Sequence, residues 1–319
     1  MNTGDNEKKF KYKVAAFYNF MPIIDSDIHF IKEELNSLAE IQELKGTILL
    51  ASEGVNGTVC GTDDAIDIFI EKITQLLKIS EINVKYSWTQ KQAFRRFKAR
   101  KKKEIVTMGL KGIDPSQSVG KYLKASEWNT FIEDPDTIII DTRNEYEIKI
   151  GNFSGAINPH TSSFREFPDW VQKYLKPLIE DNPSLKIGMY CTGGIRCEKA
   201  TSYLIEEGFS DVHHLEGGIL KYLEEVSPEE NLWDGECFVF DQRVSLNNQL
   251  LPGSHSMCHA CGLPVSPEDL KKPTYIKGLQ CEACVNKYTD RDRARFAERQ
   301  RQIDEVMKRL PENSNWPSA

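Results

Sequence analysis

A single cysteine stands in surroundings that suit reactive thiol chemistry. Cys191 follows a short apolar stretch, and Gly193 and Gly194 come soon after it, ahead of a segment whose apolar residues recur at helical spacing. The glycines allow backbone N–H groups to turn toward one spot, and the start of the helix behind them adds the positive end of its dipole. Arg196 can add a fixed charge. Such a cradle stabilises a thiolate, or a persulfide built on it, so Cys191 is the predicted nucleophile.

The spacing of this loop separates two kinds of anion chemistry. Four residues lie between Cys191 and Arg196. A phosphatase-type loop has one residue more, and its arginine would fall at Cys197, so the tighter ring here suits a terminal sulfur better than a tetrahedral oxyanion. The alternative is that Cys191 is a small buried residue at a strand end, although a core cysteine has no need of the two glycines. The predicted site comprises Cys191 and Arg196 as catalytic residues with Thr192, Gly193, Gly194, Ile195 and Cys197 around them.

Cys197 has two interpretations that the sequence leaves open. It could resolve a persulfide or sulfenate on Cys191 by forming a disulfide, or it could be a core residue in the first helical turn. The histidines of the same region, His160, His213 and His214, have no motif around them, and we assign them no role.

Four further cysteines form two Cys-x-x-Cys pairs near the C-terminus. Nineteen residues separate the pairs, a spacing typical of zinc-ribbon sites, in which each pair presents two thiolates to one tetrahedral ion. Disulfides are the alternative, which a reducing compartment disfavours. Four protein ligands leave no open position for substrate, so the zinc would be structural. The expected ligands are Cys258, Cys261, Cys281 and Cys284, with His255 and His259 as less favoured substitutes.

A strongly basic segment interrupts an acidic chain. Residues 91–103 contain eight lysines and arginines and no acid, whereas the whole chain carries a net charge of −7. Such a segment can neutralise phosphates, and Phe94 and Phe97 offer stacking faces for unpaired bases. The alternative is a solvated basic helix whose two phenylalanines face the core. The predicted RNA-binding residues are Arg95, Arg96, Lys98, Arg100, Lys101, Lys102 and Lys103.

Length and composition predict a multidomain protein of the cytoplasm. The 319 residues are too many for one ordinary core. No apolar run approaches the thickness of a bilayer, the N-terminus has no signal-peptide core, and we therefore expect no membrane association and reduced cysteines. There is no nucleotide-binding glycine motif and no ligand set for a redox metal or flavin. Residues 1–10 and 311–319 are predicted to be polar tails.

The elements that must position these residues fall into three parts. Residues 11–103 predict a ferredoxin-like βαββαβ domain, with helices capped by Ser26 and Thr62 and an apolar face that includes Ile41. After a linker at 104–120, residues 121–226 alternate strands and helices, which predicts an α/β domain with a parallel sheet. Its expected parts include a helix capped by Ser126, a central strand ending at Asp141, a short strand at 155–158 and a helix at 168–179. Residues 227–319 would form the cysteine-rich segment, with a strand-like stretch at 232–243 and a charged helix at 286–310.

Several short motifs recur along the chain in an order found in known proteins. They are residues 46–51, 53–58, 141–143, 146–147, 151, 155–157, 191–200, 215–219 and 258–261. By these motifs the middle of the chain resembles a rhodanese domain, and most of the chain resembles the rhodanese-domain tRNA uridine hydroxylase family. The resemblance implies that the protein uses molecular oxygen to install 5-hydroxyuridine at the wobble position of tRNA, with a sulfur or electron donor as a further partner. It places the family's essential cysteine, proposed to carry a persulfide, at Cys191.

Two other functions stay open on the sequence alone. The cradle by itself would suit a persulfide sulfurtransferase that acts on RNA or a small acceptor. The basic segment and the cysteine pairs by themselves would suit a non-catalytic RNA-binding adaptor, although the intact Cys191 loop argues against that function.

Overall fold

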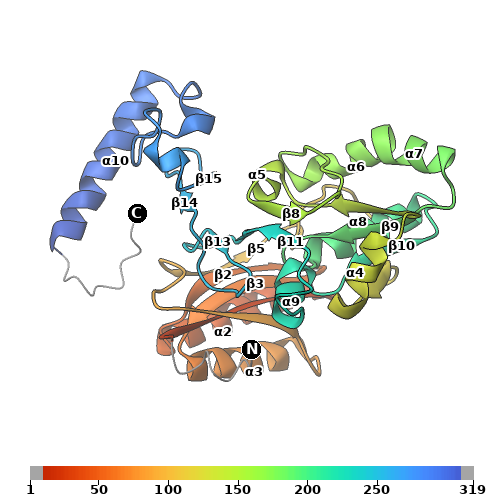
Figure 1. Ribbon diagram of the computed structural model, residues 1–319. Coiled ribbons are helices and arrows are strands. Elements are labelled where there is room, and N and C mark those ends of the chain that lie inside the picture. Colours follow the sequence, from red (N-terminus) through yellow and green to blue (C-terminus); the bar gives the residue numbers. More distant parts are fainter. Residues whose placement is uncertain (1–9, 310–319) are drawn as a thin grey trace.

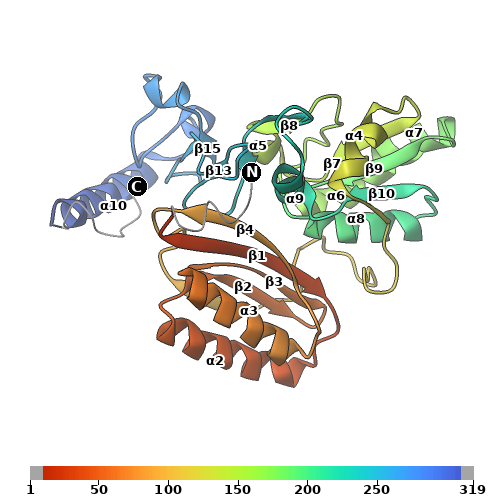
Figure 2. The same cartoon turned by 60° about the horizontal axis from the view of Figure 1, so that its bottom comes forward.

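The N-terminal part has the predicted ferredoxin-like fold. The computed structural model describes residues 10–309. The chain runs through β1 (Tyr12–Phe20), α2 (Asp25–Ile41), β2 (Lys45–Ala51), β3 (Gly54–Gly61), α3 (Asp63–Leu77) and β4 (Asn83–Thr89). These strands form one sheet in the order β4-β1-β3-β2, with β1 antiparallel to both of its neighbours. Both helices cover the same face of the sheet, which leaves the other face turned toward the rest of the molecule (Figures 1 and 2).

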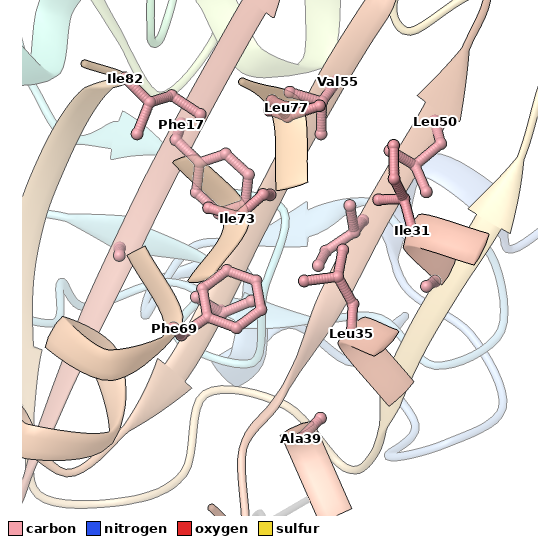
Figure 3. Close-up of a cluster of buried hydrophobic side chains, with 14 of the residues drawn as sticks. Phe17, Ile31, Leu35, Ala39, Leu50, Val55, Phe69, Ile73, Leu77 and Ile82 are labelled. Carbon is pink, nitrogen blue, oxygen red and sulfur yellow. The ribbon is translucent and has the colours of Figure 1, made fainter. Parts of the chain in front are cut away.

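The core of this part lies between the two helices and one face of the sheet. Leu35 of α2 and Phe69 of α3 are fully buried there, and Figure 3 shows how they approach side chains of the strands. Helical spacing of apolar residues predicts this arrangement. The expectation that Ile41 faces inward was wrong, because it is 75 % exposed at the helix end. The cap at Thr62 is confirmed by its bond from the Ala65 N–H, whereas α2 begins after Ile24 rather than Ser26.

The basic segment adds a fifth strand to this sheet. β5 (Phe97–Lys101) pairs in parallel with β2 and occupies the sheet edge. The alternative of a solvated basic helix is therefore wrong. Phe97 packs against the helix-side core, and Ala99 is buried in it. Because side chains alternate along a strand, Lys98 and Arg100 lie on the opposite face.

The middle part is an α/β domain with the predicted parallel sheet. Its strands lie side by side in the order β6 (Lys121–Leu123), β10 (Val212–Leu215), β9 (Lys186–Tyr190) and β7 (Thr137–Asp141). α4 (Ala125–Glu133) and α9 (Gly218–Glu225) share one core with the sheet. α8 (Ile195–Glu206) shares the other with α6 (Phe167–Trp170), the π-helical turn η2 (Val171–Leu175) and α7 (Lys176–Asp181). The fold class predicted from the sequence is thus confirmed.

Two local details of this domain differ from the predictions. Residues 155–158 form no strand; only Ile157 bridges to Ile140, because Gly155 turns the backbone with φ of 80°. α4 begins after Lys124, not Ser126, and Glu127 closes the cap by accepting the Lys124 N–H. β7 ends at Asp141 as expected and leads into α5 (Glu145–Ile148) and β8 (Gly151–Phe153).

Residues 104–120 join the two parts without helix or strand. The first residues of this segment pack against the rest of the protein, since Ile105 and Met108 are buried. The Lys199 ammonium of α8 contacts Glu53 at 2.9 Å and Glu104 at 2.7 Å, and bonds to the Val106 carbonyl. This lysine therefore joins α8 to both the ferredoxin-like part and the connecting segment.

The C-terminal part consists of short hairpins and one long helix. β11 (Trp233–Gly235) pairs with β8, and β12 (Cys237–Phe238) with β13 (Ser245–Leu246), so the predicted stretch 232–243 is two strands with a break. β14 (Ser256–Met257) and β15 (Pro264–Val265) lie next to the cysteine pairs. α10 (Asp290–Arg309) begins four residues later than predicted. The predicted polar tails fall almost wholly outside residues 10–309, and in that range no helix has the length and apolarity to span a membrane.

Candidate functional site

A cavity of about 470 Å³ opens where the three parts of the chain meet. One wall is the open face of the ferredoxin-like sheet, including Tyr18 and Lys85. A second wall is the loop that carries Cys191, and a third comes from residues 239–243 of the C-terminal part. Figure 2 shows the sheet below α8 and α9 in this arrangement. Nothing in the local sequence indicates which side chains of distant segments share this cavity.

The loop after Cys191 forms the predicted cradle of amides. Gly194 has φ of 97° and donates its N–H to the Cys191 sulfur at 3.1 Å. The backbone N–H groups of Arg196 and Cys197, in the first turn of α8, also donate to this sulfur. A side chain at Gly194 would be strained at this φ, so the glycine is required for the cradle. The sequence pattern placed these groups correctly because they lie within seven consecutive residues.

The surroundings of the two thiols of the loop shift their pKa values in opposite directions. Burial by itself would raise the pKa of Cys191, but a hydrogen bond from the Cys197 thiol, the Arg196 charge and the two amides outweigh it and lower the pKa to about 5. Burial and the neighbouring Cys191 anion raise the pKa of Cys197 well above its usual range. Cys191 is therefore a thiolate at neutral pH, and Cys197 is the protonated donor beside it.

Arg196 is held by a carboxylate that the sequence analysis did not assign. Its guanidinium makes a bidentate pair with Glu147 at 2.6 and 2.8 Å, and both side chains are buried. Thr192 bonds to both partners. Glu147 also accepts the Asn144 N–H at the start of α5, so an Asn-x-x-Glu capping pattern marked its helix, though not its partner. Arg196 thus supports the loop from behind while its charge acts on the sulfur.

A second buried arginine has a purely architectural setting. Arg143 pairs with Asp141 at 2.6 Å and donates to the carbonyls of Glu147 and Gly151. Burial would lower its pKa, but the Asp141 charge raises it, so the pair stays ionised. Neither residue lines the cavity among the described residues. This pair fixes the end of β7 and the start of α5, and thereby the position of Glu147.

The floor of the cavity continues onto the basic strand β5. One row of cross-strand neighbours runs across all five strands of the sheet. Its members are Lys85, Ala16, Thr58, Thr47 and Lys98. Since cross-strand partners point to the same face, Lys98 lies on the face that forms the cavity floor. Arg100 continues the adjacent row, which includes Tyr18, Asn56 and Leu49.

The other basic residues of this segment do not share that face. Lys101 points toward the helices and pairs with Asp25 of α2 at 2.6 Å. Arg95, Arg96, Lys102 and Lys103 are exposed in the turns on either side of β5. The seven predicted RNA-binding residues therefore divide into two on the cavity face, one paired on the helix side and four at the strand ends.

The four C-terminal cysteines lie together as a candidate metal centre. Their sulfur atoms are all within 4.8 Å of one another, and Cys261 and Cys281 are 3.7 Å apart. Zinc–thiolate bonds of about 2.3 Å in a tetrahedron require sulfur separations of about 3.8 Å, whereas a disulfide would need about 2.05 Å. The spacing therefore fits a tetrahedral ion and not disulfides. His259 contributes only its carbonyl, which accepts from Arg299 of α10.

The histidines of the middle domain play no part in the cavity lining of the described structure. His160 is exposed beside Glu145, and His213 contacts Asp211 at 2.9 Å. Burial lowers the pKa of His214 to about 4, so this ring is neutral and packs on Tyr122.

Two family descriptions match separate parts of the chain, and several relatives match all or nearly all of it. Residues 12–105 match the UPF0176 acylphosphatase like domain, and residues 124–225 match the rhodanese-like domain. The chain is 79 % identical over 319 residues, the full length of both proteins, to the tRNA uridine(34) hydroxylase of Prochlorococcus marinus strain NATL1A. It is 54 % identical over 305 residues to that of strain MIT 9313, covering 95 % of this chain and 98 % of the relative. With the hydroxylase of Synechococcus strain CC9605 it shares 55 % identity over 297 residues, 92 % of this chain and 91 % of the relative. These matches confirm the resemblance read from the motifs.

Proposed function

The chain belongs to the tRNA uridine(34) hydroxylase family, and from this premise we propose that it hydroxylates uridine 34 of tRNA in the cavity beside Cys191. The observation that carries the proposal is the Cys191 sulfur, which accepts a backbone amide in the wall of a cavity that a basic strand borders. The enzyme would act in the cytoplasm, where its tRNA substrate is found.

The cavity suits a single nucleotide rotated out of an RNA chain. Its volume of about 470 Å³ is that of a small-molecule site, and its walls are mainly apolar with a few polar groups. Phe240 is 62 % exposed at this cavity and offers a stacking face for a base. Enzymes that modify a base commonly extrude it into such a pocket, where the reactive group can reach it.

Cys191 would act as the nucleophile in this reaction. We propose that its thiolate adds to the 6-position of the uracil ring, which makes the 5-position electron-rich toward an oxidant derived from molecular oxygen. Loss of the proton at the 5-position and of the thiolate would then release the hydroxylated base. The second oxygen atom must be reduced, so a sulfur or electron donor is an expected partner. Cys191 is fully buried in the cavity wall, so the loop must yield or a terminal sulfur must extend from it for contact.

The same cradle also favours sulfur transfer, which is the second candidate function. A thiolate stabilised by amides can accept sulfane sulfur and pass it to RNA or a small acceptor. Nucleoside mass spectrometry of tRNA from cells without the gene separates the candidates. Loss of 5-hydroxyuridine supports hydroxylation, loss of a thiolated nucleoside supports sulfur transfer, and an unchanged profile would leave only the RNA-binding adaptor.

Two of the basic residues are expected to hold the RNA backbone. Replacing Lys98 and Arg100 by alanine should weaken tRNA binding, because both lie on the cavity face of the sheet. Each lost phosphate contact lowers the slope of log affinity against log salt by about 0.7 to 0.9, so the double variant should lose about 1.4 to 1.8. Fluorescence anisotropy with labelled tRNA over a salt series measures both quantities.

The matched control is Lys101→Ala on the same strand. This residue points toward α2 and pairs with Asp25, so its removal should leave the salt slope nearly unchanged. Equal effects of Lys101→Ala and of either cavity-face substitution would show that the basic segment acts only through its overall charge and would contradict the proposed path of the RNA.

We propose that the four-cysteine cluster binds structural zinc. The loops that contain the two cysteine pairs contact α10 and the residues before it. Arg299 of α10 donates to the carbonyls of His259 and Gly278, and Tyr288 donates to the carbonyl of Ala260. The ion would hold these loops together, and it would leave no position for substrate.

Removal of one ligand should release the metal and loosen only the C-terminal part. Cys281→Ser is expected to reduce bound zinc from about one equivalent to almost none, since three thiolates bind much more weakly than four. Zinc content by mass spectrometry and limited proteolysis near α10 measure the effect. Cys60→Ser provides the control, because Cys60 is a buried core residue of the N-terminal part. Full zinc retention in Cys281→Ser would refute the assignment.

A further inference from the structure

One buried lysine in the cavity has no hydrogen-bond partner. Lys85 of β4 is 4 % exposed, and its Nζ makes no hydrogen bond within the described residues 10–309. It lines the same cavity as Cys191. An unpaired ammonium is costly to bury, so its presence in a folded protein calls for a function that a neutral side chain would not serve.

The domain interface is shaped to admit this side chain. Lys85 lies over the ring of Tyr18 at 4.5 Å. A Cβ at Gly194 would stand 2.7 Å from the Tyr18 hydroxyl. This glycine of the rhodanese domain therefore makes room for the tyrosine of the ferredoxin-like sheet over which Lys85 lies.

Cys191 is the anion near Lys85 that lines the same cavity, whereas Glu198, Glu216 and Glu224 are not among its described lining residues. The other charges that act on Lys85 are those of Glu198, Glu216 and Lys221, and the Lys85 charge acts in turn on Glu224. Glu198 already accepts hydrogen bonds from Tyr18 at 2.9 Å and Tyr122 at 2.8 Å. Cys191 accepts the Gly194 N–H of its own loop.

We propose that Lys85 is a positioning residue whose ammonium group is the counter-charge of the Cys191 sulfur anion, so that the ferredoxin-like part completes the active site of the rhodanese loop. The inference rests on the proposed function only in that Cys191 is the reacting group. The N-terminal part would then have a second role besides RNA binding, because its Lys85 also influences the protonation state of the Cys191 thiol.

The titration of the two groups defines a pH range for this pairing. Burial lowers the pKa of Lys85 to about 8, against the opposing effect of Cys191 and Glu198, and the pKa of Cys191 is about 5. Both groups are charged between these values. Above pH 8 the ammonium loses its proton, and the sulfur anion loses its counter-charge.

The test compares Lys85→Met with Lys221→Met, a nearby surface lysine paired with Glu225. The readout is the thiolate absorbance of each protein as a function of pH, taken as the difference from the same protein carrying Cys191→Ser. Loss of a nearby opposite charge should raise the midpoint of Cys191 by about one pH unit or more in Lys85→Met, with no change in Lys221→Met. Lys85→Arg keeps the charge and should stay near the wild-type midpoint. An unchanged midpoint in Lys85→Met would overturn the proposal.

The stability of the same variant provides a second test. Removal of one partner leaves the other charge buried and alone, so Lys85→Met should unfold at a lower temperature than the wild type, whereas the same substitution in the Cys191→Ser background should cause no such loss. An equal loss of stability in both backgrounds would show that the ammonium has a different partner and would also overturn the proposal. Neither measurement uses RNA or oxygen, so failure of the hydroxylase assignment and failure of this inference give different results.

Discussion

Cys191→Ser will abolish hydroxylation of uridine 34, with a loss of about 10³-fold or more, while the protein remains folded. Removal of a nucleophile from a unit of interacting groups leaves only residual activity. Serine occupies nearly the same volume, but its hydroxyl stays protonated at neutral pH and carries no sulfur. Purified variant and wild type would be incubated with tRNA that lacks the modification, and 5-hydroxyuridine would be counted by nucleoside mass spectrometry.

Cys197→Ser is the informative companion to this variant. It removes the thiol that donates to Cys191 but keeps a hydroxyl in the same place. If Cys197 is a core residue, the activity of Cys197→Ser should lie within a few-fold of the wild type. If Cys197 resolves an intermediate on Cys191, the variant should complete one turnover and then stop. Continued turnover by Cys191→Ser would contradict the cysteine mechanism altogether.

Glu147→Gln will destabilise the rhodanese domain by about 3 to 5 kcal/mol, the usual result of leaving one member of a buried ion pair alone. Arg196 would lose a bidentate partner at 2.6 and 2.8 Å in a buried position. Urea unfolding monitored by tryptophan fluorescence measures the change. Glu145→Gln is the control, since Glu145 is half-exposed in the same helix, and its loss should change stability by no more than about 0.5 kcal/mol.

The same pair makes stability depend on pH at the acid end. Burial would raise the pKa of Glu147, but the charge and hydrogen bonds of Arg196 hold it below its usual value of 4.5. The stabilisation is therefore fully present above the unfolded pKa and is lost as the pH falls through the folded one. Wild-type unfolding should become easier as the pH drops below about 4.5, and Glu147→Gln should show a smaller change. Equal pH dependence in both proteins would exclude this pair as the cause.

Sequence reasoning predicted the geometry of the two candidate sites whose residues lie close together in the chain. The cradle of Cys191 and the four-cysteine cluster each depend on short spacings, so the printed order of residues predicts their geometry. The amphipathic helices of the ferredoxin-like part follow from helical spacing for the same reason.

The features it missed depend on contacts between distant segments. Glu147 meets Arg196 across 49 positions, and Lys85 reaches the cavity only because two domains dock. The strand β5 was not predicted, because its pairing partner β2 is distant from it in the sequence. Its alternation of Phe97 and Ala99 with charged residues was visible, but the number of lysines and arginines around it obscured that pattern.

The contact of Lys199 with both Glu53 and Glu104 limits how the substrate can arrive. Because this ammonium joins α8 to the ferredoxin-like part, separating the two walls of the cavity would break two ion pairs of a buried lysine, and we expect this to oppose the entry of stacked bases. The nucleic acid is then expected to deform instead. Nucleotides in a strained loop can swing outward at little expense, whereas those in a duplex cannot, so the mechanical stiffness of the protein would itself select for an anticodon.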